Sequence, residues 1–90
     1  MNKGELIEAI SNKANISKKD SQVALDAICE SITQALVQGD KVSLVGFGTF
    51  EIRTRAERKG RNPQTGAEVI IPSRKAPVFK ASRVLKESIN

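Results

Sequence analysis

The sequence has no histidine, tryptophan or tyrosine, and among its 90 residues it has one cysteine and three phenylalanines. Without histidine there is no Ser-His-Asp triad, no imidazole base and no histidine metal ligand. One cysteine forms no internal disulfide and no cysteine-rich zinc site, and it indicates a reducing compartment. No apolar run approaches the ~18 residues of a membrane span, and no secretory signal opens the chain. We therefore expect a cytoplasmic protein that uses no metal and no cofactor.

What the chain does have is an uneven distribution of positive charge. There are 15 Lys and Arg residues against 10 Asp and Glu residues, a net charge of +5. Residues 1–52 have a net charge of −2, whereas residues 53–86 hold ten basic and two acidic residues and have a net charge of +8. Such asymmetry indicates a polyanionic partner. A merely solubilising surface is the weaker alternative, because so many cations fall within 34 residues.

The first half of the chain has the pattern of two helices. Asn2 is a suitable N-cap for a helix that ends near residues 14–15, with Glu5 in the capping-box position. Ser17 is the N-cap of a second helix that runs from about Lys18 to Gln38, and Gly39 follows its end. An apolar stripe along the second helix consists of Leu25, Ile28, Cys29, Ile32 and Leu36. Within this stripe we expect Cys29 to be a small buried hydrophobic residue.

The second half changes to the two-residue period of strands. Residues 42–52 alternate around the turn Gly46-Phe47-Gly48 and predict a β-hairpin. Residues 53–61 contain no large apolar side chain, residues 62–66 form a dense turn signal, and residues 67–72 predict a returning strand. Residues 73–77 are expected to be a basic connector and residues 78–80 a short strand, after which Ser82 caps a last helix. The pattern predicts an α+β fold with a small antiparallel sheet and a protruding ribbon.

Such a ribbon cannot bury a core of its own, because an isolated two-stranded ribbon is only marginally stable in water. The remaining body of roughly 65 residues is small enough that oligomerisation would be an ordinary source of stability. The cations of the ribbon suit DNA, because each phosphate that is neutralised releases condensed counterions. Pro63 lies at the expected tip. Most loop prolines only shape turns, so the residue alone favours that role over a wedge between base pairs.

Several residues at fixed offsets carry a family resemblance. Gly46-Phe47-x-x-Phe50, then Arg55, Arg58, Gly60, Asn62-Pro63 and Thr65, resemble the signature of the bacterial histone-like HU and integration host factor proteins. The opening Met1-Asn2-Lys3 and the segment 60–66 are more similar to the HU branch. HU and integration host factor are themselves standard examples of architectural minor-groove proteins, so the mechanism that follows is implied by the resemblance.

The resemblance implies one histone-like domain over residues 1–90, which forms an intertwined dimer. Its dimerisation body comprises about residues 1–52 and 76–90, and its DNA-embracing β-arm about residues 53–75. It implies that Pro63 is the intercalating wedge, reversing the preference above. The implied DNA-binding residues on the arm are Arg53, Arg55, Arg58, Lys59, Arg61, Asn62, Pro63, Arg74 and Lys75. Lys3, Lys80, Arg83 and Lys86 are weaker candidates for contacts with flanking DNA, and Phe47, Phe50, Phe79, Leu36 and Leu44 are assigned to the dimer core.

The implied function is sequence-independent binding and bending of double-stranded DNA, with bent or nicked DNA as a possible preferred form. The chain would be a nucleoid-associated protein that condenses and stabilises DNA, as a homodimer or as a heterodimer with a sister chain. Alternatives are a sequence-preferring bender like integration host factor, a helix-turn-helix protein, a scaffold for acidic proteins, and an RNA-binding protein. The RNA alternative rests on residues 46–50, but three phenylalanines offer little surface for base stacking. Catalysis is the least favoured alternative, since no phosphate-binding loop and no paired acids are present.

Overall fold

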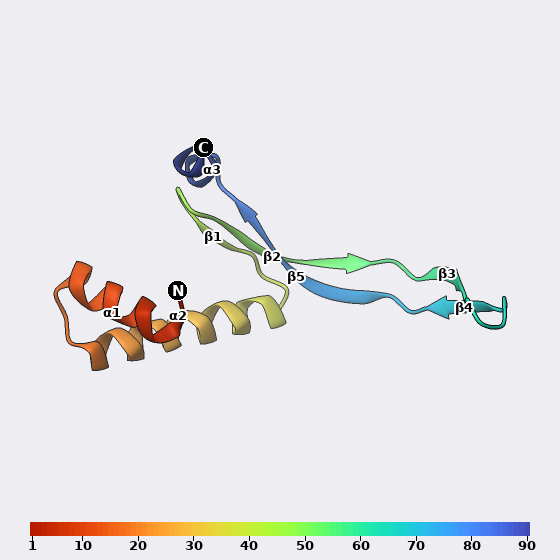
Figure 1. Cartoon of the computed structure of the whole chain (residues 1–90), viewed down its shortest axis with the longest axis horizontal. Coiled ribbons are helices and arrows are strands. Elements are labelled where there is room, and N and C mark those ends of the chain that lie inside the picture. The colour runs from red at the N-terminus through yellow and green to blue at the C-terminus, as the bar shows by residue number, and fades with distance from the viewer. The chain divides into compact units, whose positions relative to one another are not determined.

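The computed structural model describes residues 1–90 and contains three helices and five strands (Figure 1). In chain order they are α1 (Lys3–Ala14), α2 (Lys18–Val37), β1 (Val42–Leu44), β2 (Gly48–Arg55), β3 (Arg58–Arg61), β4 (Glu68–Ile71), β5 (Arg74–Ala81) and α3 (Arg83–Ile89). The chain divides into two compact units, Met1–Gln34 and Ala35–Asn90, with the boundary in the last turn of α2. The predicted α+β class is confirmed.

Local side-chain capping begins both helices of the first unit. The Asn2 side-chain oxygen accepts a hydrogen bond from the Glu5 amide at 2.9 Å, and Asn15 ends α1 in the left-handed conformation with φ of 56°. The Ser17 hydroxyl oxygen then accepts from the Asp20 amide at 3.0 Å at the start of α2. Each contact satisfies a backbone N–H that has no partner within the helix. The predicted caps and helix starts are confirmed.

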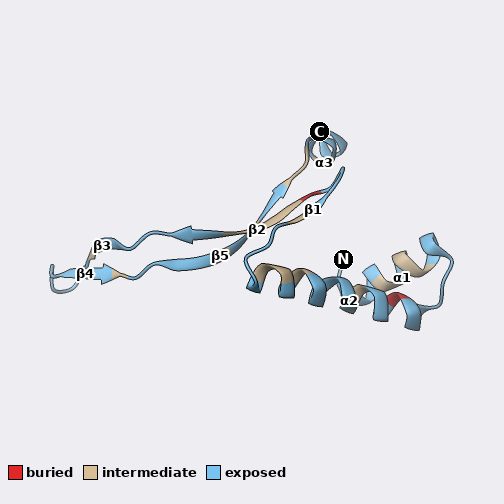
Figure 2. Cartoon of the chain, turned by 180° about the vertical axis from the view of Figure 1, so that it is seen from behind, coloured by how far each residue is buried: buried red, intermediate tan, exposed pale blue.

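The prediction of a buried Cys29 is wrong for this chain, because the residue is exposed. Cys29 lines an open groove of about 530 Å³ that is also lined by Leu6 and Leu25. The apolar stripe on α2 therefore exists as a pattern, but within the first unit α1 covers only part of it. Figure 2 shows that most of both helices is exposed or only half-buried.

In the second unit, one glycine turn connects α2 to the sheet and another connects β1 to β2. Gly39 has a φ of +85°, and its amide donates to the Leu36 carbonyl at 3.0 Å, which ends α2 as predicted. Between β1 and β2, the Phe47 amide donates to the Leu44 carbonyl at 2.9 Å, and Gly46 has a φ of +83°. These positive φ angles favour glycine, because side chains with a Cβ rarely adopt them. The predicted hairpin is confirmed.

The main sheet has the strand order β1-β2-β5, and both neighbours pair with β2 in antiparallel orientation. The β2–β5 ladder runs from Gly48 opposite Ala81 to Arg55 opposite Arg74. The predicted connector over residues 73–77 is therefore wrong beyond its first residue, because β5 already begins at Arg74. Pro77 is tolerated opposite Ile52, since β5 is an edge strand and its missing N–H costs the sheet little there.

A separate two-stranded sheet, β3 paired with β4, continues the ribbon beyond the main sheet. Its register places Arg58 opposite Ile71 and Arg61 opposite Glu68. The turn at the tip is closed by the Asn62 amide, which donates to the Ala67 carbonyl at 2.8 Å. No third strand accompanies this part of the chain, as the polar composition of residues 53–61 predicted.

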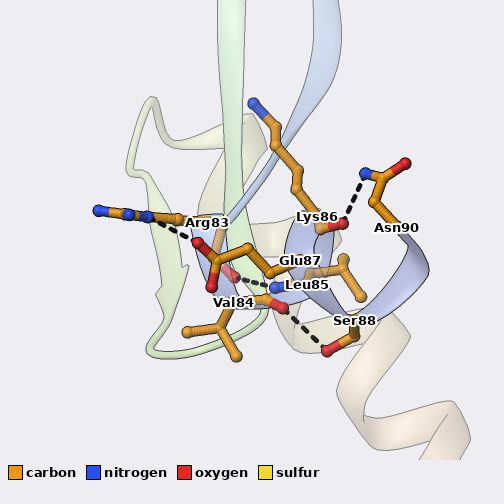
Figure 3. Close-up of polar contacts among 8 residues, drawn as sticks. Arg83, Val84, Leu85, Lys86, Glu87, Ser88 and Asn90 are labelled. Carbon is orange, nitrogen blue, oxygen red and sulfur yellow. Dashed lines mark hydrogen bonds and ion pairs between the residues drawn. The ribbon is translucent and has the colours of Figure 1, made fainter.

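The last helix, α3, contains several polar contacts between its own residues (Figure 3). The Ser82 hydroxyl oxygen accepts from the Leu85 amide at 3.1 Å, which confirms the predicted cap. Arg83 Nε and Glu87 Oε1 form an ion pair at 2.9 Å, one helical turn apart. Across the whole chain, no hydrophobic side chain is buried, and Ser21 is the one fully buried side chain (Figure 2).

Gly48 provides a test of the packing between β2 and β5. A Cβ at this position would lie 2.5 Å from the Lys80 carbonyl oxygen and equally close to the Phe79 ring. We expect Gly48→Ala to lower the free energy of unfolding by about 1–3 kcal/mol, as overpacked sites do. Chemical denaturation followed by circular dichroism measures this loss.

Gly4→Ala is the matched control, because a Cβ there would meet only the Asn2 side chain at 3.5 Å. In the helix α1 this change should be neutral or stabilising by up to about 1 kcal/mol. Equal stability of the Gly48→Ala and wild-type chains would contradict the close packing described here.

Candidate nucleic-acid interface

The side chains of β2 and β5 are divided between two faces of the main sheet. Successive residues of a strand point to opposite faces, and directly paired residues share a face. One face, which we call the phenylalanine face, carries Val42, Leu44, Phe50, Ile52, Pro77 and Phe79. The other, which we call the cationic face, carries Arg53, Arg55, Arg74, Lys80 and a single acid, Glu51. Arg53 and Arg55 were predicted to share one face of a strand, and the register adds Arg74 and Lys80 of the neighbouring strand to the same face.

The cations of the ribbon have almost no carboxylate partners. Arg55 and Arg74 lie directly opposite each other, an arrangement of like charges that destabilises a sheet by itself. Apart from the contact of Arg53 with Glu51, none of the predicted arm cations forms an ion pair; these are Arg55, Arg58, Lys59, Arg61, Arg74 and Lys75. All of them are exposed. The arrangement leaves this surface able to neutralise an external anion.

Three of these arginines surround a small hollow where β2 ends and β3 begins. The hollow has a volume of about 170 Å³ and is lined by Arg55, Arg58, Arg74, Ala56, Ile71 and Pro72. Guanidinium groups are planar donors that match the geometry of phosphate oxygens. The structure therefore brings together arginines from both limbs of the ribbon, and it does so around a space that an oxyanion can enter.

The ribbon tip holds Pro63 in an exposed turn. The Asn62 side-chain oxygen accepts from the Gln64 amide at 2.9 Å, and the Gly66 amide donates to the Asn62 carbonyl at 2.7 Å. Gly66 has a φ of +72°, which completes the reversal. Asn62 thus stabilises the turn through its side chain and its backbone, and Pro63 is an exposed residue whose ring carries no hydrogen-bonding group.

The weaker candidates differ from the arm cations, because most of them are already paired. Lys3 Nζ lies 2.8 Å from Asp26 Oδ1, and this hydrogen-bonded contact raises the pKa of the lysine. Lys80 lies 3.1 Å from Glu51, and Arg83 is paired with Glu87. Lys86 alone of this group has no ion pair. The distribution of free charge favours the arm as the principal anion-binding surface.

Sequence reasoning missed Glu51 and Lys41. Glu51 lies within 4 Å of three cations, and its hydrogen bond with Lys80 is the main cause that lowers the pKa of its carboxyl group. Lys41 contacts the same carboxylate at 3.7 Å. The available signal was the two-residue alternation, which places Glu51 on the same face as Arg53.

The predicted dimer-core residues form an apolar surface in the second unit. The ring centroids of Phe47 and Phe79 lie 5.3 Å apart, and those of Phe50 and Phe79 lie 4.8 Å apart, both in tilted arrangements. Phe47, Phe79 and Leu44 remain 46%, 42% and 43% exposed. Leu36 and Phe50 are half-buried. The three phenylalanines thus form one cluster, and much of that cluster is open to solvent.

A comparison with known families matches residues 1–90 to the model described as bacterial DNA-binding protein. The chain belongs to this family. It is 57% identical over 90 residues to DNA-binding protein HU-1 of Halalkalibacterium halodurans, covering 100% of both chains. It is 56% identical over 89 residues to DNA-binding protein HU of Geobacillus stearothermophilus, covering 99% of both. The family resemblance deduced from the motifs is confirmed.

Among solved structures, the chain is similar to HU in the Anabaena HU–DNA cocrystal structure. The TM-score is 0.89 at 46% sequence identity, with 99% of this chain and 97% of the other covered. That relative was crystallised with DNA, and its fold matches this one over nearly the full length. In this chain, none of the three helices has the length and hydrophobicity required to cross a bilayer.

Proposed function

We propose that this protein binds and bends double-stranded DNA with little regard to sequence, as an architectural protein of the bacterial nucleoid. The observation on which the proposal depends is the ribbon of residues 53–75, whose exposed cations, apart from Arg53, lack carboxylate partners on both limbs. Membership in the bacterial DNA-binding protein family supports it. A structural rather than a catalytic role follows, and we assign no residue to catalysis.

The proposed mechanism begins with the release of counterions from the phosphate backbone. Arg55, Arg58 and Arg74 surround one hollow, so that they can neutralise neighbouring phosphates together. Lys59, Arg61 and Lys75 add charge along the ribbon, while Asn62 maintains the tip turn. None of these contacts requires a particular base, because phosphate contacts position a protein without specifying sequence.

Pro63 is the residue to which we assign the bend. An apolar group inserted between base pairs unstacks them and kinks the duplex, and the bent DNA then meets more of the protein surface. The exposed position of Pro63 in the turn at the ribbon tip supports this role. Sequence-preferring bending, as in integration host factor, is the second candidate, favoured by the same geometry.

Replacing the wedge should separate bending from binding. We expect Pro63→Ala to reduce the bend of a short duplex more than it reduces affinity for linear DNA, because the arm cations remain. Energy transfer between dyes at the two ends of the duplex measures the bend. Gln64→Ala, a change at the neighbouring tip residue, is the control. Equal bending by the wild-type and Pro63→Ala proteins would remove the wedge from the mechanism.

Neutralising one arm cation should reduce the dependence of binding on salt. We expect the plot of log affinity against log salt to become shallower by about 0.9 per chain for Arg58→Gln, which removes one phosphate contact from each arm. Lys13→Gln, in α1 and outside the proposed interface, should leave the slope unchanged. Competition with unrelated duplex sequences and with single-stranded RNA, measured by fluorescence anisotropy, distinguishes the alternatives. A flat salt response of the wild-type protein would favour a scaffold for acidic proteins instead.

We further propose that two chains associate through the phenylalanine face. A 90-residue chain that buries no hydrophobic side chain lacks the core that ordinarily stabilises a fold. The open cluster of Phe47, Phe50 and Phe79 is the apolar surface best placed to be covered. Association of identical chains is the simplest arrangement, and a sister chain with the same face would be an equivalent partner.

The assembly is tested by its dependence on concentration. We expect a dimer in sedimentation equilibrium at micromolar concentration, and a melting temperature that rises with protein concentration because folding and association are coupled. Phe79→Ala, which removes both aromatic contacts, should lower the melting temperature and weaken association together. A folded monomer at micromolar concentration would count against the proposal.

A further inference from the structure

Glu51 occupies the centre of the cationic face. It lies on β2, the middle strand of the three-stranded sheet, and is paired with Val78 of β5. Arg53 follows two residues later on the same face, and Lys80 lies diagonally across on β5. Lys41 approaches from the other side, immediately before β1. The carboxylate is therefore surrounded by cations from three different segments.

The contacts are unequal, and they leave the cations accessible. The distance from Glu51 to Lys80 Nζ is 3.1 Å, and those to Lys41 Nζ and Arg53 Nε are each 3.7 Å. The Glu51 side chain is 12% exposed, whereas the three cationic side chains are 57% to 72% exposed. The anion is thus enclosed in the sheet surface, and the ends of the cations extend into solvent.

Glu51 is also the one carboxylate on this face. The other paired positions of β2 and β5 that share it are Thr49, Arg53, Arg55, Arg74, Ala76, Val78 and Lys80. Because the neighbouring cations lower the pKa of Glu51, its carboxyl group stays ionised at neutral pH. One negative charge therefore remains in the middle of a surface that otherwise carries only positive charges.

We propose that Glu51 is an internal competitor for DNA phosphate, which partly neutralises Lys41, Arg53 and Lys80 and thereby limits how tightly this face of the sheet holds DNA. The inference rests on the proposed DNA-binding function, and it identifies Glu51 as a residue that lowers the affinity for DNA. Lys41 joins the interface through its contact with Glu51.

The physical reason is that a phosphate and the carboxylate draw on the same cations. A phosphate that approaches Lys80 gains less attraction while Glu51 is within 3.1 Å of that ammonium group. A half-neutralised face neutralises fewer phosphates and therefore releases fewer condensed counterions from the DNA. The salt dependence of binding is smaller for the same reason. The arm cations without carboxylate partners then contribute most of the affinity.

Glu51→Gln removes the competing charge and keeps the size of the side chain. We expect affinity for a linear duplex to rise roughly two- to fivefold at low salt, the range of surface ion pairs. We also expect the salt slope to steepen by as much as about 0.9 per chain, equivalent to one additional phosphate contact in each chain. Fluorescence anisotropy over a series of salt concentrations measures both quantities, with circular dichroism at the assay temperature to verify folding.

Glu8→Gln is the matched control, because it makes the same change in net charge on α1, where Glu8 is exposed and forms no ion pair. A rise in affinity of the same size for Glu8→Gln would overturn the inference, since net charge alone would explain it. Unchanged or weaker binding by Glu51→Gln would also overturn it. If the wild-type protein shows no salt-dependent binding of duplex DNA, the proposed function itself fails, which is a different result.

Lys80→Gln tests the same inference without altering the carboxylate. Because Glu51 already neutralises part of the Lys80 charge, this variant should reduce the salt slope by clearly less than about 0.9 per chain. In the Glu51→Gln background the same replacement should remove a full contact. An equal loss in both backgrounds would show that Glu51 does not compete, and it would overturn the inference even if one variant were destabilised.

Discussion

Successive side chains of a β-strand point to opposite sides, and in β2 and β5 this alternation separates two kinds of chemistry. Phe50 and Phe79 face one side of the sheet, while Arg53, Arg55 and Arg74 face the other. Over the six pairs from Gly48 to Arg53, the aromatic side chains lie on one face and the charged side chains on the other, whereas the next pair places Lys75 on the phenylalanine face opposite Thr54. A shift of the register by one residue would mix the two sets. The apolar surface and the charged surface therefore depend on the same ladder of backbone hydrogen bonds.

The charged surface carries an electrostatic cost in the absence of an anion. Arg55 opposite Arg74 is a pair of like charges with no carboxylate between them. Exposure to water and salt screens this repulsion, so the ribbon tolerates it. When a row of phosphates approaches, the attraction between phosphates and arginines outweighs the repulsion between the arginines. The gain in binding free energy is largest for cations that have no carboxylate partner. The contrast with Lys3 and Arg83, which already have carboxylate partners, is the reason for proposing the ribbon rather than the helices as the main surface.

Features that depend on neighbouring residues were predictable from the sequence. The caps at Asn2, Ser17 and Ser82 need only a side chain and a backbone amide three residues away, and all three are present. The extent of β5 was not predictable in the same way. Ser73 to Pro77 resembles a loop in composition, and only the pairing with the distant strand β2 makes its last four residues a strand. Tertiary pairing overrides local preference here.

In the candidate site, too, features local in sequence were predictable and features that depend on tertiary pairing were not. The arm cations could be predicted because they cluster in sequence, and the family motif indicated Pro63. Strand alternation places Glu51 on the same face as Arg53, but its contacts with Lys41 and Lys80 could not be predicted, since these residues come from two other segments and meet it only across the sheet. Exposure of Cys29 was mispredicted for a related reason: an apolar stripe indicates which face will be covered, but not whether the same chain covers it.

The two faces of the sheet also explain how association and DNA binding can coexist. If a second chain covers the phenylalanine face, it buries Phe79 and the adjoining Phe47, which are 42% and 46% exposed in the single chain. The cationic face lies on the opposite side of the same strands and stays open to solvent. Each chain would then contribute one charged face and one arm to the assembly, without competition between the partner chain and the phosphates. A sheet with both kinds of residue on one face could not meet these two demands at once.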